Sequence, residues 1–111
     1  MYSIIIPTLN NLAYLKLCLR SIEKNSKYKH EIIVHINEGI DGTLDYVKEN
    51  SINYSYSEKN SGVCVAFNEG VKKATNKFIV LGHDDMYFFP GWDECFANEL
   101  KKIESDKDFF L

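Results

Sequence analysis

The stretch VCVAFNEGVKKATNKFIVLGHDD, residues 63–85, decides the fold of this chain. Its first half places apolar residues at the spacing of one helix face: Val63, Ala66, Phe67, Gly70, Val71 and Ala74. FIVLG, residues 78–82, then predicts a buried strand that stops at His83-Asp84-Asp85. A helix that leads into a short apolar strand is the repeating unit of an α/β layer.

The same alternation is present on the N-terminal side of this stretch. Residues 2–6 predict a strand, which Pro7 should end because proline has no N–H to donate. Residues 31–36 predict a second buried strand. Between them, an N-cap at Asn10 or Asn11 and apolar residues at helical spacing predict a helix: Leu12, Leu15, Leu19 and Ile22.

The remaining segments complete the pattern. Asp41 should cap a short helix that ends near Asn50, and residues 52–57 alternate enough for a third strand. After a loop, apolar residues at helical spacing predict a last helix: Trp92, Phe96, Leu100 and Ile103. Residues 109–111 look like the opening of a further strand. The order predicts an α/β fold, a three-layer Rossmann-like arrangement with a mostly parallel sheet and helices on both faces.

Composition excludes several classes of protein. The 111 residues suffice for one domain, at 1–111, and the 45% apolar fraction indicates a packed globular protein. A net charge of −3 with scattered Lys and Arg indicates no nucleic-acid partner. The longest apolar run, Ile4-Ile5-Ile6, is too short to span a bilayer, and no signal peptide precedes it. Three cysteines without a CxxC pair indicate reduced thiols, so we expect a cytoplasmic protein, free or peripheral at the membrane face.

Polar or glycine-bearing segments follow each of the four predicted strands. In an open parallel sheet, ligands bind beyond the carboxyl ends of the strands, and these ends lie at one edge. We therefore expect four segments to gather there: Thr8-Leu9-Asn10, Asn37-Glu38-Gly39, Asn60-Ser61-Gly62 and His83-Asp84-Asp85.

Asp84 and Asp85 carry most of the argument for function. Adjacent carboxylates at a strand end repel each other, which destabilises the fold. A hard divalent cation removes this repulsion and can also bind diphosphate oxygens. The alternatives are a solvated acidic loop and a helix cap. His83 is better explained as a hydrogen-bonding neighbour than as a third ligand, because Mg²⁺ and Mn²⁺ favour oxygen donors. His35, inside a predicted strand, is most simply a hydrogen-bonded core residue.

Four segments, in order, resemble family 2 glycosyltransferases, which have the GT-A fold. Residues 3–10 resemble their opening strand and loop, and residues 31–43 resemble their second strand and acidic turn. Residues 60–70 resemble their Asn-x-Gly loop and following helix, and residues 83–92 resemble the DxD region with its trailing Pro-Gly-Trp. The resemblance implies that residues 1–111 are the nucleotide-sugar-binding part of a GT-A domain, without the acceptor-binding half.

The resemblance also implies roles for individual residues. Thr8 and Asn10 would line the nucleobase pocket. Asn37 stands where the family usually has an aspartate that reads the base, and its amide could accept from uracil N3–H. Asp84 would contact the ribose or sugar, and Asp85, with Asp84, would ligate Mn²⁺ or Mg²⁺. The implied nucleotide-sugar contacts are Pro7, Thr8, Asn10, Asn37, Glu38, Asn60, Gly62, Asn68 and Asp84.

The chain departs from the family pattern at three places. Gly82 occupies the position of the first carboxylate of a strict DxD motif, so Asp84 and Asp85 must serve. The acidic turn, usually Asp-Gly-Ser, is Asn37-Glu38-Gly39 here. Phe67 replaces a commonly basic residue before Asn68, which removes a phosphate or sugar contact.

The resemblance implies transfer of a sugar, with inversion, from a nucleoside-diphosphate sugar to an acceptor. We expect the donor to be a UDP-sugar and the acceptor to be an unknown glycan, lipid or protein. No residue is assigned as the general base, because capping and first-turn charge explain Asp93 and Glu94. The alternative is a nucleotide-sugar-binding module without turnover. A nucleotidyltransferase is disfavoured because residues 8–12 contain no Gly, Lys or Arg, and a signalling phosphoacceptor is disfavoured because position 37 is Asn. The edge left by the absent half predicts self-association.

Overall fold

The computed structural model describes residues 1–103 as alternating strands and helices, and the strand expected at 109–111 lies outside the described residues. The elements are β1 (Tyr2–Leu9), α1 (Leu12–Asn25), β2 (Glu31–Asn37), α2 (Thr43–Glu49), β3 (Asn53–Ser57), α3 (Val63–Val71), β4 (Phe78–Leu81) and α4 (Trp92–Ile103). The described strands form one sheet in the order β3-β2-β1-β4, and every neighbouring pair is parallel. The predicted alternation and parallel sheet are confirmed.

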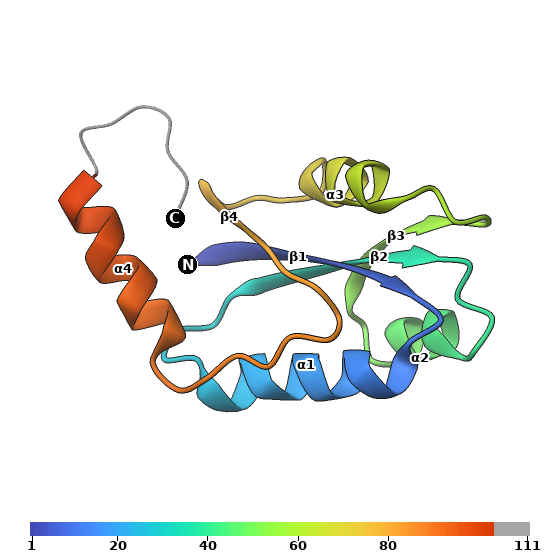
Figure 1. The fold of residues 1–111 in the computed structure, drawn as a ribbon, viewed down its shortest axis with the longest axis horizontal. Helices are drawn as coiled ribbons and strands as arrows, with labels where there is room; N and C mark the ends of the chain where they lie inside the picture. Colours follow the sequence, from blue (N-terminus) through green and yellow to red (C-terminus); the bar gives the residue numbers. More distant parts are fainter. Residues whose placement is uncertain (104–111) are drawn as a thin grey trace.

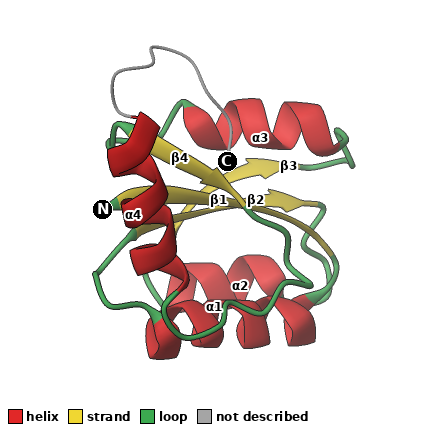
Figure 2. Cartoon of the chain, turned by 60° about the vertical axis from the view of Figure 1, so that its left-hand side comes forward, coloured by secondary structure: helices red, strands yellow, loops and turns green. Residues whose placement is uncertain are grey.

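Helices cover both faces of the sheet, as predicted (Figure 1). Helices α1 and α2 lie on one face and α3 lies on the other, so that the strands form the middle of three layers (Figure 2). Helix α4 lies at the end of the sheet where β1 begins. Within residues 1–103, no helix combines the length and the apolar character that a membrane span needs.

The main core lies between the sheet and helices α1 and α2. Because side chains alternate between the two faces of a strand, every second residue of β1 and β2 points into this layer. The buried residues of this cluster are Ile4, Ile6, Val34 and Ile36 from the strands, Leu15, Cys18, Leu19 and Ile22 from α1, and Val47 from α2.

The opposite face of the sheet packs closely against α3. Gly70 is buried, and a Cβ at this position would collide with Cγ2 of Ile5. Of the predicted apolar face, Ala66 and Gly70 are buried, whereas Val63 and Val71 are 53% and 41% exposed. The helical periodicity was therefore correct, but the buried stripe is narrower than expected because small residues bring α3 close to the sheet over a short contact.

Pro7 does not end the first strand, which corrects the prediction from its missing donor. Strand β1 continues to Leu9 and pairs with β2 along this length. The carbonyl of Ile5 accepts from the N–H of Gly82 at 2.8 Å, on the β4 side. Alternate residues of a strand bond to opposite neighbours, so Pro7 also faces the β4 side, beyond the last pair, Ile5 with Leu81. Proline is tolerated there because no ladder partner needs its N–H.

Strand β4 is less buried than predicted. Ile79 and Leu81 are 36% and 47% exposed. Both lie on the α3 face, since they pair with Ser3 and Ile5 of β1. Helix α3 makes its main contacts on the sheet with β1, β2 and β3. The strand is at the edge of the sheet formed by residues 1–103, and its α3-side residues are only partly covered there.

Asp41 caps two helices. Its Oδ1 accepts from the N–H of Thr43 at 3.2 Å, the first residue of α2, although Gly42 rather than Asp41 occupies the N-cap position of this helix. Its Oδ2 accepts from the N–H of Leu12 at 3.0 Å, at the start of α1. Asn11 occupies the N-cap position of α1 but makes no side-chain capping bond. The aspartate in the loop before α2 therefore supplies the cap expected from Asn10 or Asn11, and it fixes the two helix starts relative to each other.

Candidate functional site

The polar strand ends gather at one edge of the sheet, as expected for parallel strands. Three contacts join segments that are far apart in sequence. Thr8 bonds Asp84, Asn10 bonds Glu38 and Ile40, and Asn37 bonds Ser61. Helices α1, α2 and α3 also begin at this edge, because each follows a strand in a parallel arrangement.

The first contact fixes Asp84 to the end of β1. The Oγ1 of Thr8, a buried residue, donates to Oδ2 of Asp84 at 2.8 Å. The bond from the N–H of Gly82 to the carbonyl of Ile5 holds the chain two residues earlier. The half-buried carboxylate of Asp84 is therefore positioned by the buried sheet, although it belongs to a loop.

Cys18 of α1 also contacts this loop. Its side chain is fully buried on α1, and its thiol donates to the carbonyl of His83 at 3.5 Å. Burial raises the pKa of Cys18 to about 12, and the charges of Asp84 and Asp85 add to the effect. Both carboxylates therefore act on the same buried thiol. Further along α1, the Oγ of Ser21 accepts from the N–H of Phe88 at 2.9 Å and donates to the carbonyl of Cys18 at 2.6 Å.

The second contact joins the loops after β1 and β2. Oδ1 of Asn10 accepts from the N–H of Ile40 at 3.0 Å, and its Nδ2 donates to Oε1 of Glu38 at 3.5 Å. Asn10 and Glu38 both have left-handed backbones, with φ of 46° and 62°. Asparagine adopts this conformation readily and glutamate does not, so Glu38 stores backbone strain of about 1 kcal/mol.

The third contact joins β2 to the loop before α3. Oδ1 of Asn37 accepts from both the N–H and the Oγ of Ser61, at 3.0 and 2.9 Å. In the same loop, Oδ1 of Asn60 accepts from the N–H of Gly62 at 3.1 Å. Gly62 has a φ of 85°, a conformation that favours glycine. The turn leaves the start of α3 without a side-chain cap, so its first N–H groups remain available at this edge.

A row of half-buried serine hydroxyl groups lies next to Asn37. His35 is fully buried, and its Nδ1 and Nε2 lie 2.7 and 3.1 Å from the Oγ atoms of Ser55 and Ser57. The Oγ of Ser57 lies 3.3 Å from that of Ser61. Burial lowers the pKa of His35, so the imidazole is neutral at pH 7. The expectation of a hydrogen-bonded core histidine is confirmed. The sequence analysis did not predict the role of these serines, although Ser55 and Ser57 are two residues apart in β3 and therefore share one face of the strand.

Two carboxylates are available for a metal ion. Asp84 is half-buried and Asp85 is exposed. Within residues 1–103, no group of three or more His, Cys, Asp or Glu side chains could enclose an ion. Mg²⁺ commonly takes one or two protein carboxylates and completes its shell with water and substrate phosphate. The pair therefore fits an ion shared with a diphosphate, and the metal role of Asp84 and Asp85 stays a prediction.

Several predicted residues are not joined to these contacts. Asn68 is exposed on α3, and Pro7 is buried within β1. No hydrogen bond between side chains of the described part links either to the strand-end contacts. The roles implied for them stay predictions.

Asp93 lies at the other end of the sheet, away from the strand ends. It is fully buried and accepts from the N–H groups of Lys27 and Tyr28 at 2.9 and 3.0 Å, and from Nε2 of His30 at 2.9 Å. Nδ1 of His30 accepts from the N–H of Tyr2 at 3.1 Å, so Nε2 carries the proton. Asp93 thus anchors α4 to the loop before β2, a larger role than the predicted first-turn charge.

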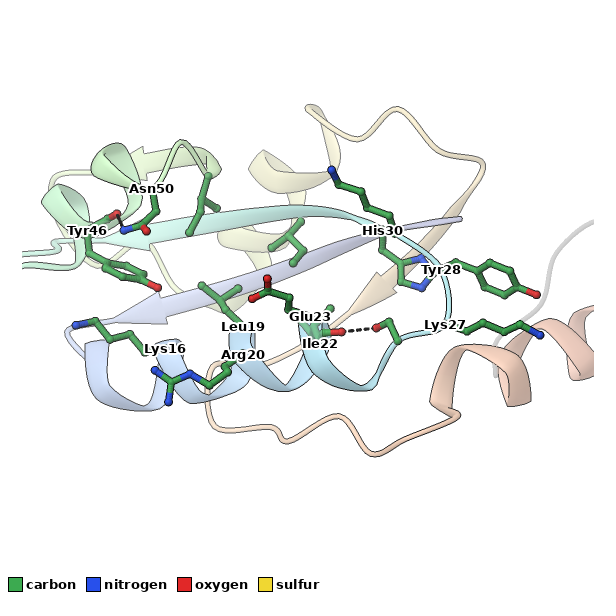
Figure 3. Close-up of a pocket in the computed structure, with 14 residues that line it drawn as sticks. Lys16, Leu19, Arg20, Ile22, Glu23, Lys27, Tyr28, His30, Tyr46 and Asn50 are labelled. Atoms are coloured by element: carbon green, nitrogen blue, oxygen red, sulfur yellow. Dashed lines mark hydrogen bonds between the residues drawn. The ribbon is translucent and has the colours of Figure 1, made fainter.

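A cavity of ≈ 780 Å³ lies between α1, α2 and the start of β2 (Figure 3). Its lining residues fall within 16–32 and 46–52, and none belongs to the predicted site. Four of them are cationic: Lys16, Arg20, Lys27 and Lys29. Lys27 is paired with Glu94, and the Nζ of Lys16 lies 4.9 Å from the ring centre of Tyr46. The candidate site is therefore the strand-end edge, distinct from this cavity.

The family model "Glycosyl transferase family 2" matches residues 3–107, and the chain belongs to this family. The chain is 36% identical over 104 residues to the uncharacterized glycosyltransferase YwdF of Bacillus subtilis (strain 168), covering 92% of this chain and 39% of the relative. It is 34% identical over 88 residues to a dolichyl N-acetyl-alpha-D-glucosaminyl phosphate 3-beta-D-2,3-diacetamido-2,3-dideoxy-beta-D-glucuronosyltransferase of Methanococcus voltae, covering 71% of this chain and 27% of the relative.

Solved structures show the same fold. S. aureus TarS 1-349 in complex with UDP superposes with a TM-score of 0.81 at 25% identity, covering 93% of this chain and 32% of that one. The Pyrobaculum calidifontis mannosyltransferase PcManGT, in complex with GDP-Man and Mn²⁺, superposes with a TM-score of 0.76 at 22% identity, covering 92% of this chain and 32% of that one. The GT-A fold expected from the resemblance is confirmed. The chain spans less than half the length of these relatives.

Proposed function

We propose that this chain binds the nucleoside-diphosphate part of a nucleotide-sugar at the strand-end edge, as the donor-binding part of a glycosyltransferase. The observation that carries the proposal is the bond from Thr8 to Asp84, which holds a carboxylate of the predicted metal pair at the end of the central strand. Membership of glycosyl transferase family 2 and the similarity to TarS, whose structure contains UDP, support the same assignment.

Each cluster has a distinct task in this proposal. Asn37 and Ser61 face the nucleobase, Asn10 and Glu38 shape the loop that borders it, and Asp84 contacts the ribose or sugar. Asp84 and Asp85 together hold Mn²⁺ or Mg²⁺ against the diphosphate, as the presence of Mn²⁺ in the PcManGT structure suggests by fold analogy. A divalent ion there supplies Lewis-acid stabilisation of the negative charge on the departing nucleoside diphosphate.

Transfer to an acceptor, with inversion at the anomeric carbon, belongs to the proposal for the whole protein. The acceptor is a glycan, a lipid or a protein. The sugar donor binds first to the residues described above, and a carboxylate base then deprotonates the acceptor hydroxyl. Asp93 does not supply this base, because it is buried and bonded at the opposite end of the sheet.

A second candidate is a nucleotide-sugar-binding module without turnover. It is favoured by one observation on the loops that follow the described strands. Four of their carboxylates, Glu38, Asp41, Asp84 and Asp85, already have loop-shaping, capping or metal-binding tasks. The remaining one, Glu58, is exposed and is held by no hydrogen bond within residues 1–103. Binding without release of free nucleoside diphosphate from a nucleotide-sugar would support the module, and release that depends on an acceptor would support the transferase.

The direct test of donor binding is a thermal unfolding series. The purified protein is melted with UDP, GDP or dTDP, each with and without Mn²⁺ or Mg²⁺. A ligand at about 100 times its dissociation constant stabilises a protein by about 2.7 kcal/mol, which raises the midpoint by roughly 10 °C for a domain of this size. A shift that needs both metal and one nucleoside diphosphate supports the proposal, whereas no shift with any combination contradicts it.

A further inference from the structure

We propose that the outer face of α1, with the aromatic loop beside it, is a docking surface for the headgroups of an anionic lipid bilayer. This α1 surface consists of Lys16, Leu17, Arg20 and Lys24 on the helix, Lys27 and Lys29 after it, and Tyr87 and Phe89 along one side. None of these residues belongs to the candidate site at the strand ends, so the inference does not rest on donor binding. It names a surface for the expected location at a membrane face.

Cations are concentrated in this part of the chain. Five of the 13 Lys and Arg residues fall within residues 16–29, and Glu23 is the single carboxylate there, although the chain as a whole has a net charge of −3. All five cations are exposed. Within residues 1–103, Lys27 alone among them forms an ion pair, with the carboxylate of Glu94. The α1 surface is therefore positive on a protein that is negative overall, and it complements anionic lipid headgroups.

The periodicity of α1 brings apolar and cationic residues together on its outer side. The inner side of the helix, which packs on the sheet, is formed by Leu15, Cys18, Leu19 and Ile22. Residues 17, 20 and 24 follow one another at intervals of three and four, so Leu17, Arg20 and Lys24 share the opposite side. Leu17 is 48% exposed although it is apolar. Arg and Lys can lay their methylene groups against lipid while their charges reach the headgroups.

The loop after β4 runs along α1 and adds aromatic side chains to the surface (Figure 1, Figure 2). The N–H of Phe88 donates to Oγ of Ser21 at 2.9 Å, and its carbonyl accepts from Nδ2 of Asn25 at 2.7 Å. The ring of Phe88 packs on the core, whereas its neighbours Tyr87 and Phe89 are 44% and 71% exposed, with ring centres 5.4 Å apart. Two hydrogen bonds thus hold an exposed aromatic pair beside the helix that carries the cations.

Exposed apolar side chains beside the cations favour a bilayer over a soluble polyanion. Aromatic and aliphatic side chains are stabilised at the headgroup level of a membrane, while neighbouring Lys and Arg contact anionic headgroups. A soluble polyanion would contact the cations and leave Leu17 and Phe89 in water. Because α1 runs alongside the strands, a flat bilayer on its outer face leaves the strand-end edge open at the side (Figure 1). Lipid docking and donor binding are therefore compatible.

The experiment measures, by sedimentation, how the purified protein partitions onto lipid vesicles. One set of vesicles is phosphatidylcholine alone, and the other is an equimolar mixture of phosphatidylcholine and phosphatidylglycerol. The double variant Arg20→Gln/Lys24→Gln removes two exposed charges from α1. Its matched control, Lys72→Gln/Lys73→Gln, makes the same charge change just after α3, on the opposite side of the sheet. All four positions are exposed, so both variants should fold as the parent does.

The parent should partition onto the anionic vesicles and not onto phosphatidylcholine alone, and added salt should release it. A cation near an anionic surface strengthens binding about fivefold, so Arg20→Gln/Lys24→Gln should weaken it about 25-fold, and the control should stay within about twofold of the parent. Phe89→Ser should weaken binding about tenfold, because it removes a ring that the headgroup region would bury. Val71→Ser, at an exposed position on α3, is the control for this change.

Three outcomes overturn the proposal. The first is equal partitioning onto both kinds of vesicle, or an equal loss in the α1 and α3 double variants. The second is retention on immobilised polyglutamate or RNA without partitioning onto anionic vesicles, which would indicate a soluble polyanion as the partner. The third is the absence of partitioning onto either kind of vesicle, whatever the thermal unfolding series shows for nucleotide binding.

Discussion

Thr8 Oγ1 donates a 2.8 Å hydrogen bond to Asp84 Oδ2, and this bond joins the end of β1 to the loop that follows β4. Thr8 is 3% exposed, so its hydroxyl is fixed by the packing around it. The position of one carboxylate of the predicted metal pair is therefore set by the central strand of the sheet. An acidic loop that was merely solvated would not need such a support.

The bond can be removed without changing the shape of the side chain. Thr8→Val should weaken metal-dependent nucleoside-diphosphate binding about tenfold, because a hydrogen bond to a charged group contributes about 1.5 kcal/mol. Thr8→Ser keeps the hydroxyl and should retain most of the affinity. Calorimetric titration measures both. Equal affinity of Thr8→Val and the parent would show that the bond has no part in ligand binding.

Asp85 offers a test of the metal role with little risk to the fold, since its side chain is exposed. Asp85→Ala should abolish the metal-dependent part of nucleotide binding and leave the unfolding midpoint without ligand within about 2 °C, as for most surface substitutions. Glu49→Ala, which removes an exposed carboxylate from the last turn of α2, is the control. Undiminished nucleotide affinity of Asp85→Ala in Mn²⁺ would remove Asp85 from the site.

Asp93 and Glu94 are neighbours in α4 with contrasting energetic roles. Asp93 is fully buried and bonds Lys27, Tyr28 and His30. Asp93→Ala should cost about 3 kcal/mol of unfolding free energy, because it leaves buried donors unpaired. Glu94→Ala breaks only an exposed pair with Lys27 and should cost less than about 1 kcal/mol. Chemical denaturation measures the difference, and equal losses would contradict the anchoring role of Asp93.

Two buried groups make stability depend on pH in separate windows. Burial lowers the pKa of His35, so the unfolded chain takes up this proton first as the pH falls. The stability associated with neutral His35 is present above the unfolded pKa of about 6.5 and is lost as pH falls toward the folded pKa, with a slope of at most about 1.4 kcal/mol per pH unit. Burial alone would raise the pKa of Asp93, but the bonds from Tyr28, His30 and Lys27 lower it overall.

The stability from Asp93 is therefore present above its unfolded pKa of about 3.9 and is lost below it, as pH falls through the folded value. His35→Gln should reduce the slope of the unfolding free energy against pH just below pH 6.5. The loss of stability at more acidic pH, which is due to Asp93, should remain. Urea unfolding at a series of pH values measures both slopes. A His35→Gln curve parallel to that of the parent between pH 6.5 and 5 would contradict the assignment of this window to His35.

The order of elements could be predicted because each helix and strand carries its own periodicity, as the run from Val63 to Asp85 illustrates. The predictions that failed depend on neighbours in space. Pro7 continues a strand because β4 has already ended beside it. Ile79 and Leu81 are apolar yet exposed, because they lie on the edge strand and α3 packs mainly on β1 and β2.

The candidate site was predictable as a set of strand ends but not as a set of contacts. Nothing in the local sequence indicates that Asp41 caps α1, or that Ser61 occupies the oxygen of Asn37. Both are long-range contacts, which depend on the relative placement of two loops. The cytoplasmic location and the self-association expected from the uncovered edge stay predictions.

The central claim is that metal and nucleotide meet at the strand-end edge, and paramagnetic broadening by Mn²⁺ tests it most directly. Amide spectra of the ¹⁵N-labelled protein are recorded with UDP in Mg²⁺, before and after addition of a trace of Mn²⁺. The account predicts that Mn²⁺ selectively broadens the signals of residues 8–10, 37–38 and 83–86. Broadening centred instead on residues 27–30, 50 and 52, which line the cavity between α1, α2 and the start of β2, would contradict it.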